Sequence, residues 1–347
     1  MKRRLYAALV AGVLVGPAGA SAQESSLPRA VARIGCEDCS GPRLLTDVRD
    51  LTLAHGRVYV VDGAPPHIRI FDLSGRSVRA FGRVGDGPGE FRFPIHLHVW
   101  PDSQFEVFDA QHSRLTRFNA TGVQQGTRTI GLGQFPVLTS SIRNPDIFVV
   151  ASTIRDTVQQ VLRMSPDSLK PANVPIGKPV NLTIREGHVM RPALAARPDS
   201  GLAIGNGTDD YRILILRADG STESAISRTL DKVRKTAAEL EADRRVRDML
   251  RQRMRRHVPD GNLPRPSRDE FRRHFNAMAY DDAGRLWVRT ERRIDVTVFD
   301  LFDAQNEYLG EYIVPDIVGA FAIGSGVIAV AVADDLGVPY VVLYRTK

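Results

Sequence analysis

The sequence predicts an all-β fold, a six-bladed β-propeller, from three observations. Short apolar strands follow turn residues at intervals of about 40 to 45 residues along most of the chain. Each of these strands has another apolar strand before it and a third after it, and the last unit supplies only three strands before the chain stops. A repeat of about 40 residues built from four short strands is typical of a propeller blade.

The six units can be read in order along the chain. Their second strands begin near residues 58, 105, 147, 202, 286 and 327. Their third strands read IRIFDLSG, RLTRFNATG, VQQVLRMS, YRILILRADG, VTVFDLFDA and YVVLYR. Only the interval from 202 to 286 is about twice as long as the others, and removing residues 231–275 from it restores the period. These residues are therefore predicted to be an insertion between blades 4 and 5.

The N-terminal part of the mature chain is predicted to close the ring. Residues 30–35 (AVARIG) form a lone strand without partners nearby in the sequence, whereas the last blade lacks a fourth strand. Placing this strand at the outer edge of blade 6 would leave no large unpaired sheet edge.

The first residues have the layout of a secretory signal peptide. Three basic residues precede a short apolar stretch, and Ala20-Ser21-Ala22 fits a cleavage site after Ala22. No later stretch approaches the length of a membrane-spanning helix. The sequence thus predicts a signal peptide over 1–22 and a single domain over 23–347 that is secreted or periplasmic, without a transmembrane segment, and monomeric.

The glycine-rich stretch GRVGDGPGEF (82–91) could cradle a phosphate or connect two blades. A phosphate loop is followed by a helix and usually contains a lysine, whereas this stretch leads into the strand IHLHV and has no lysine. It is interpreted as a connector. GRVGDGPGEFRFP, with VYVVD and IRIFDLSG before it, resembles the NHL-repeat type of six-bladed propeller, and GRLWVRT with VFDLFDAQNEYLG is similar to a group of exported bacterial propellers. The resemblance implies the fold, and propellers include enzymes, receptors and scaffolds.

In that alignment GCEDCSGP (35–42) falls in the register of the GRVGDGP connector. A redox CxxC motif would open a helix, which Ser40-Gly41-Pro42 disfavours, and no further cysteine is present to complete a zinc site. For an exported protein a local disulfide between Cys36 and Cys39 is the leading interpretation, with free thiols as the alternative.

The net charge of +7 is concentrated in one segment. Residues 228–275 hold fifteen Lys or Arg and eight Asp or Glu, and the rest of the mature chain is slightly acidic. Thr236-Ala-Ala-Glu239 is a capping box that predicts a helix, and a second short helix could start at Ser267. The insertion is either a solvated face packed on the propeller or a cationic lid in which arginines such as Arg247 and Arg251 bind anions.

In a four-stranded blade, the loops after the second and fourth strands emerge on one face, around one mouth of the central channel. We call this the connector face. A protein, a glycan or a small anionic ligand is expected to bind there, and export argues against nucleic acid as the natural partner. The candidate ligand-binding residues on this face and in the insertion are His67, His112, Arg155, Asp209, Arg247, Arg251 and Arg292.

The favoured function is therefore that of an exported binding or scaffold protein. The alternative is a metal-dependent hydrolase or lyase of the lactonase or esterase type, which would use Ca²⁺ or Zn²⁺; otherwise no cofactor is expected. His96 and His98 point to one side of an inner strand and are the weak metal candidates, although both could equally be core residues. Other residues near the starts of inner strands are Asp50, His188 and Asn276. Asp62 and Asp109 end second strands and are expected to fix turns instead of binding metal.

Overall fold

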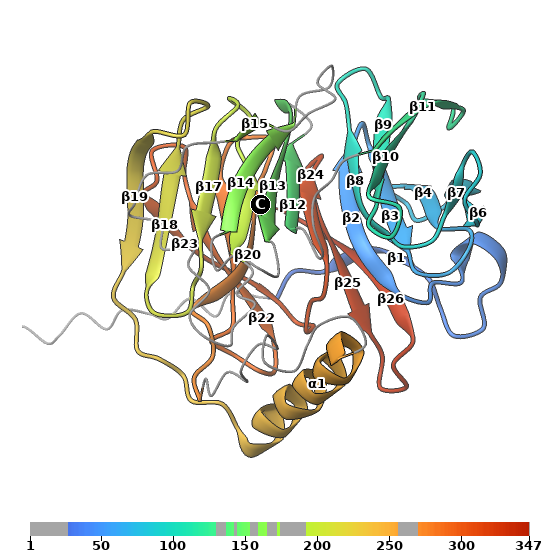
Figure 1. The fold of residues 1–347 in the computed structure, drawn as a ribbon. Coiled ribbons are helices and arrows are strands. Elements are labelled where there is room, and N and C mark those ends of the chain that lie inside the picture. The colour runs from blue at the N-terminus through green and yellow to red at the C-terminus, as the bar shows by residue number, and fades with distance from the viewer. Residues whose placement is uncertain are drawn as a thin grey trace, which may run out of the picture.

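The computed structural model describes residues 27–129, 137–141, 144–152, 159–164, 172–173, 192–255 and 270–346. These residues form six four-stranded antiparallel sheets, which match the six predicted units (Figure 1). From the inner to the outer strand, blade 1 contains β2 (Val48–Ala54), β3 (Arg57–Asp62), β4 (Ile68–Asp72) and β5 (Ser77–Phe81), and blade 2 contains β8 (Pro94–Val99), β9 (Phe105–Asp109), β10 (Arg114–Phe118) and β11 (Gln124–Thr129). Blade 3 contains β12 (Val137–Ser141), β13 (Asn144–Ser152), β14 (Gln159–Met164) and β15 (Ala172–Asn173), and blade 4 contains β16 (Ala193–Ala196), β17 (Leu202–Gly205), β18 (Tyr211–Leu216) and β19 (Thr222–Arg228). Blade 5 contains β20 (Phe275–Tyr280), β21 (Leu286–Thr290), β22 (Thr297–Phe302) and β23 (Tyr308–Val314), and blade 6 contains β24 (Phe321–Gly324), β25 (Val327–Ala333), β26 (Pro339–Arg345) and β1 (Ala30–Ile34).

The first and last strands of the chain pair with each other. β1 is antiparallel to β26, with Ile34 opposite Val341 and Arg33 opposite Val342. The sixth sheet is therefore completed by the N-terminal strand, as the sequence predicts. The inner strands contact one another in the order β2, β8, β12, β16, β20, β24 and back to β2, which closes the ring.

The hydrophobic core lies between neighbouring sheets instead of at one centre. One cluster, for example, joins Ile34 and Leu343 of blade 6 to Leu51, Val58 and Phe71 of blade 1. Equivalent clusters fill the interfaces of blades 1 and 2, 3 and 4, 4 and 5, and 5 and 6. Because each sheet is buried on both faces, its central strands are apolar without strict alternation, and stability depends on every blade having two neighbours.

The stretch from 82 to 91 is a connector, as the sequence predicts. It joins β5 to β8 and contains two short parallel strands, β6 (Arg83–Val84) and β7 (Glu90–Phe91). Gly82 opens it with a φ of 94°, and a Cβ there would lie 3.0 Å from the ring of buried Phe91. A larger residue would therefore be strained and would press on that ring.

Cys36 and Cys39 form a disulfide in the connector that leads from β1 to β2. The predicted pairing is therefore present in the structure. A short 3-10 helix, η1 (Gly41–Arg43), follows it. No α-helix opens at the second cysteine, in agreement with the sequence interpretation.

The only α-helix in the described part of the chain, α1 (Ala237–Arg255), lies between β19 and β20. Figure 1 shows it beyond the sheets, at the end of the molecule where β19 and β25 finish. The predicted capping box is formed: the backbone N–H of Thr236 donates to Glu239 Oε2 at 2.8 Å, and that of Glu239 donates to Thr236 Oγ1 at 3.3 Å. The predicted second helix start at Ser267 lies outside the described residues.

Two backbone segments, 233–235 and 270–272, pair at the base of this insertion, and we call this pair the neck. Arg234 bridges to Phe271, the N–H of Arg272 donates to the carbonyl of Val233, and that of Lys235 donates to the carbonyl of Glu270. The Arg272 guanidinium binds both carboxylate oxygens of Glu239, at 2.8 and 2.9 Å. The Arg272 hydrogen bond lowers the pKa of Glu239 to about 2. The first turn of α1 is thereby fixed to the chain that enters blade 5.

Within the described residues, no helix is long and apolar enough to cross a membrane. The predicted signal peptide lies outside the described part of the chain.

Ring closure can be tested with two substitutions in β1. Ile34 is fully buried against blade 1, whereas the Val31 side chain is 45% exposed. We expect Ile34→Ala to lower the free energy of unfolding by about 2 to 4 kcal/mol through the lost burial and the cavity left behind. Val31→Ala should change it by less than about 0.5 kcal/mol. Urea denaturation measures both, and equal effects would contradict the assignment of β1 as a packed closing strand.

Candidate functional site

The inner strands of all six blades surround a central cavity of about 340 Å³. Its wall includes residues of β2, β8, β12, β16, β20 and β24, with apolar side chains such as Leu51, Val99 and Met278 between the polar ones. Small-molecule sites in proteins are concave, of this size or larger, and mostly apolar with a few placed polar groups. The cavity is therefore a candidate site for a small molecule.

Polar side chains gather in the wall where the inner strands begin, which is the connector face. They are Arg49, Asp50, His96, Asn276 and, from the end of the neighbouring second strand, Arg289. The inner strands of blades 1, 2 and 5 each have a register shift here, at Arg49, Ile95 and Asn276. Such bulges redirect side chains, and two of the three bulged residues line the cavity.

Asp50 and His96 form a pair across blades 1 and 2. His96 Nδ1 lies 2.9 Å from Asp50 Oδ2, which also accepts the backbone N–H of Leu97 at 2.9 Å. His96 and His98 both line the cavity, and that they point to the same side stays a prediction. No group of three or more metal-ligating side chains occurs in the described ranges. His188, another residue considered for the enzyme alternative, lies outside these ranges.

His98 is buried, and its ring contacts the Trp100 ring edge-on at 4.4 Å between centroids. Burial, reinforced by the charges of His96, Arg117 and Arg128, lowers the pKa of His98 to about 3. The imidazole is therefore neutral at pH 7. Its Nε2 has no hydrogen-bond partner among the described residues.

Arg289 places a partly buried cation in the cavity wall. Its Nε donates to Asn276 Oδ1 at 2.7 Å, and its Nη1 donates to the carbonyls of Val318, at 3.0 Å, and Gly319. All of these acceptors are neutral, and no carboxylate of the described residues pairs with this guanidinium. Burial lowers the pKa of Arg289, partly opposed by the charge of Glu291. An arginine stays protonated at neutral pH even so, and Nη2 makes no hydrogen bond to the described residues.

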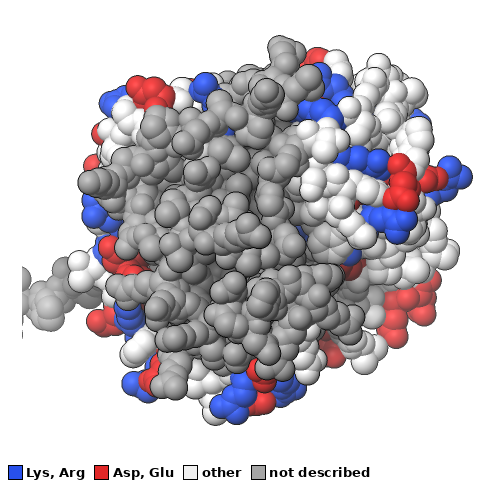
Figure 2. Space-filling view, viewed as in Figure 1, with Lys and Arg blue, Asp and Glu red and all other residues white. Residues whose placement is uncertain are grey.

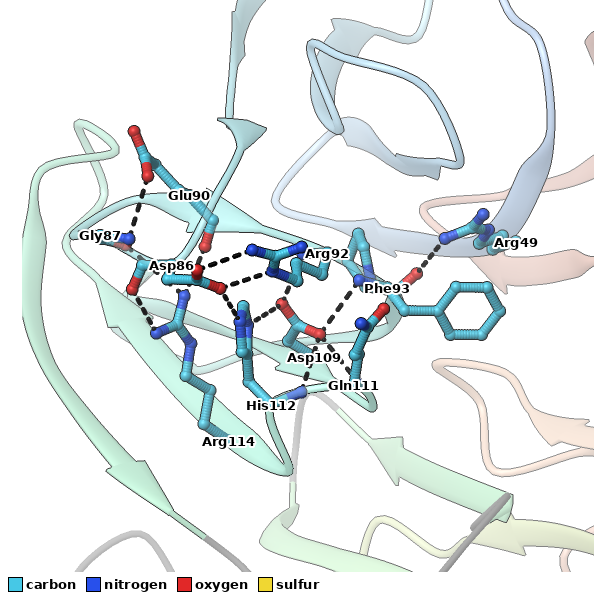
Figure 3. Close-up of polar contacts among 11 residues, drawn as sticks. Arg49, Asp86, Gly87, Glu90, Arg92, Phe93, Asp109, Gln111, His112 and Arg114 are labelled. Carbon is cyan, nitrogen blue, oxygen red and sulfur yellow. Dashed lines mark hydrogen bonds and ion pairs between the residues drawn. The ribbon is translucent and has the colours of Figure 1, made fainter. Parts of the chain in front are cut away.

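Arg49 is the second cation of this mouth, from blade 1. Its Nε pairs with Asp47 at 2.8 Å, its Nη1 donates to the Pro94 carbonyl at 3.4 Å, and its guanidinium lies 4.2 Å from the centre of the Phe93 ring. Figure 3 shows Arg49 reaching toward Phe93 from the neighbouring blade. Arg49 is thus partly neutralised, in contrast to Arg289.

The candidate residues predicted on the connector face differ in how far the structure exposes them. His67 is 1% exposed, with Nδ1 2.9 Å from the Asp62 carbonyl and its ring edge-on to Phe91, so its expected exposure is not seen. The tight turn after β3 folds it inward. Arg292 binds buried Asp300 through two nitrogens, at 3.0 and 2.7 Å, and Glu311 at 2.9 Å. Its charge is therefore already neutralised.

The remaining candidates lie on separate blades or on α1. Asp209 is exposed in the turn between β17 and β18. Arg155 lies outside the described residues. Arg247 and Arg251 are in α1, with side chains outside the described part of the structure. Among the described residues, which lie around the edge of the view in Figure 2, acidic and basic side chains lie next to each other instead of forming one basic patch.

His112 belongs to a charged network that shapes the GRVGDGPGEF connector (Figure 3). Its Nε2 lies 2.5 Å from Asp86, and its Nδ1 lies 2.8 Å from Asp109. Arg92 also binds Asp86 through two nitrogens, at 2.5 and 2.7 Å. Hydrogen bonds from Arg92 first and His112 second lower the pKa of Asp86. The network fixes the loop tip to the turn after β9.

Carboxylates at the ends of second strands hold the incoming connector of the same blade. Asp62 accepts the backbone N–H of Thr46 at 3.0 Å, and Asp109 accepts those of Arg92 at 2.8 Å and Phe93 at 3.1 Å. Burial raises the pKa of Asp109, but these hydrogen bonds outweigh it and the net shift is downward. In the turn that follows each strand, the N–H of Ala64 donates to Asp62 at 2.9 Å and that of Gln111 donates to Asp109 at 3.1 Å, so the prediction that both aspartates fix turns is confirmed.

Comparison with known proteins agrees with this architecture. Residues 41–142 match the model of DUF5128, a family described as a 6-bladed beta-propeller. The chain is a β-propeller. Solved structures with the same fold include a Bacteroides fragilis protein described as exported, with a TM-score of 0.53 and 11% identity over 91% of this chain and 94% of that one. A DUF4221 member from Bacteroides vulgatus has a TM-score of 0.58 and 11% identity over 92% and 97% of the two chains.

A streptogramin B lyase is also similar, with a TM-score of 0.50 and 12% identity over 90% of this chain and 97% of that one. At such identities the likeness shows the fold alone. The comparison with curated proteins gave no match. The likeness to NHL repeats in particular stays a resemblance.

Sequence reasoning missed the two arginines of the cavity mouth. Arg49 belongs to no motif, and Arg289 lies in GRLWVRT, a stretch that indicates the fold and not a site; both positions read as ordinary strand. Their positions in the strands could have predicted them. A charged residue near the start of an inner strand, or at the end of the second strand opposite it, lies at the mouth of the channel.

The buried state of His98 predicts a pH dependence of stability. Its folded pKa of about 3 lies below the unfolded value of 6.5, so between these pH values only the unfolded chain binds the extra proton, and stability falls as pH falls. We expect His98→Leu and His98→Gln to remove this loss, which amounts to about 2 kcal/mol at pH 5. Both variants should show the same flatter dependence in urea denaturation between pH 8 and pH 5, whatever their stability at pH 8. A slope like that of the wild type would contradict a neutral buried His98.

Proposed function

We propose that this chain is an exported binding protein that holds a small anionic ligand in its central cavity, at the mouth on the connector face. The ligand would place a carboxylate, phosphate or sulfate group against Arg289 and its uncharged part along the apolar wall. Export rests on the predicted signal peptide over 1–22.

The observation that carries this proposal is the state of the Arg289 guanidinium. It is partly desolvated, the acceptors of its hydrogen bonds are neutral oxygens, and Nη2 has no protein acceptor among the described residues. Removing a cation from water without a carboxylate in direct contact with it is costly, and a charge-assisted hydrogen bond to an anion recovers much of that cost. The low dielectric of the cavity strengthens this attraction.

Other features of the connector face suit such a ligand. Arg49 adds a second, partly neutralised cation to the mouth. Several large apolar side chains on connector-face loops are exposed, which could contact the uncharged part of a ligand or a protein partner: Leu44, Phe93, Ile294, Ile317 and Leu336. In this proposal the basic insertion over 231–275 is an accessory that raises the local positive potential near the mouth.

Binding of benzoate and of sulfate at constant ionic strength tests the proposal. Isothermal titration should detect binding by the wild type, and Arg289→Met should weaken it about 10- to 100-fold, because the variant loses a charge-assisted hydrogen bond. Arg293→Met is the matched control, since it removes the same charge from an exposed ion pair with Asp295 on the same face. Arg293→Met should bind as the wild type does.

An equal loss of anion affinity in the two variants would mean that the net charge of the protein controls binding. That result would contradict a site at Arg289. Absence of binding of both anions by the wild type would contradict the proposed ligand class.

A further inference from the structure

A continuous chain of hydrogen bonds leads from the insertion neck to the cavity cation. The backbone N–H of Arg273 donates to Glu291 Oε2 at 3.0 Å, and Asn276 Nδ2 donates to Glu291 Oε1 at 2.5 Å. Asn276 Oδ1 then accepts Arg289 Nε at 2.7 Å. Each oxygen of the Glu291 carboxylate therefore has its own donor.

Glu291 fixes which end of the Asn276 amide faces Arg289. A carboxylate only accepts hydrogen bonds, so the Asn276 NH₂ group must point to it, and the carbonyl oxygen is left for the guanidinium. A reversed amide would set its NH₂ group against the guanidinium, which has no acceptor, and its oxygen against the carboxylate. Asn276 is also the bulged residue of β20, which places its side chain between Glu291 and Arg289.

The same carboxylate fixes the neck of the insertion. Arg273, whose N–H it accepts, directly follows Arg272, and Arg272 binds Glu239 in the first turn of α1. The position of Arg289 and the attachment of α1 thus share one anchor. In blades 1 and 2 the equivalent carboxylates, Asp62 and Asp109, hold their own connector and turn, and Asp62 also pairs with Arg69 of β4 at 3.7 Å.

We infer that Glu291 and Asn276 are positioning residues, which direct Arg289 Nη2 into the cavity and link the anion site to the attachment of the insertion. This inference rests on the proposed function for its ligand. The orientation of Arg289 itself can be measured without any ligand.

Phenylglyoxal, which reacts with the two terminal nitrogens of arginine, reports on that orientation. In the wild type, Nη1 is held by two carbonyls, so modification of Arg289, followed by peptide mass spectrometry, should be slow. Glu291→Ala frees the Asn276 amide to turn and should raise the Arg289 rate about fivefold, which corresponds to the loss of one hydrogen bond. Glu311→Ala is the matched control, because it removes an exposed carboxylate from the same blade, and should leave this rate unchanged.

Exchanging the two side-chain types gives a rescue. In the double variant Glu291→Gln with Asn276→Asp, the NH₂ group of the introduced glutamine can donate to the carboxylate of the introduced aspartate, while the glutamine oxygen still accepts the Arg273 N–H. The new carboxylate also accepts Arg289 Nε. Modification should return to the slow wild-type rate, but benzoate binding should be lost, because the ion pair now neutralises Arg289. A double variant with fast modification would overturn the inference.

The link to the insertion has its own measurement. Trypsin should cut after the exposed Arg244 and Arg245 of α1 faster in Glu291→Ala than in the wild type, and at the wild-type rate in the double variant. Unchanged modification and cleavage in Glu291→Ala would overturn the inference. If Glu291→Ala fails to fold, Asn276→Ala, which leaves the Arg273 anchor, should raise modification of Arg289 without raising cleavage.

These results are separable from those on the proposed function. Slow modification in the wild type, fast modification in Glu291→Ala and rescue in the double variant support the positioning role even if benzoate does not bind. Benzoate binding that Glu291→Ala leaves unchanged would support the anion site and overturn the positioning role.

Discussion

Pairing of β1 with β26 is the constraint on which the rest of the molecule depends. The core lies in the interfaces between blades, so each blade is stable only when it has a neighbour on both sides, and the closing strand supplies Ile34 to one of these interfaces. Closure also places the inner strands around one cavity. The two cations of its mouth come from blades 1 and 5, which are distant in the sequence and lie on either side of blade 6 in the ring.

One interaction recurs in blades 1, 2 and 5, and blade 5 modifies it. A carboxylate at the end of the second strand accepts the backbone N–H of a residue just before the inner strand: Asp62 from Thr46, Asp109 from Arg92, and Glu291 from Arg273. In blades 1 and 2 the other contacts of the carboxylate are to the same connector, to its own turn and, for Asp62, to Arg69 of β4. In blade 5 it orients Asn276 and, through it, Arg289. The carboxylate that holds the connector of blade 5 is thereby also part of a candidate binding site.

The fold could be predicted from the sequence because it depends on features that are local or periodic. Turn residues and apolar strands set the spacing of the units, the capping box Thr236–Glu239 marks the start of α1, and the lone strand before Gly35 matches the missing strand of the last unit. The site could not be predicted in the same way. His67 and Arg292 look like exposed polar residues in the sequence, but burial in a turn and pairing with Asp300 withdraw them from solvent. Arg289 reads as an ordinary strand residue, because its desolvation and its neutral partners depend on contacts between blades.

Arg289 presents to the cavity a cation that no carboxylate of the described residues contacts. Bromide is a small anion that can be located by its anomalous scattering, so crystals soaked in sodium bromide show whether this cation binds an anion. We expect a bromide ion in the cavity in contact with Arg289 Nη2, and its loss in crystals of Arg289→Met under the same conditions. Bromide at the outer surface with none at Arg289, or an undiminished cavity site in the variant, would contradict it.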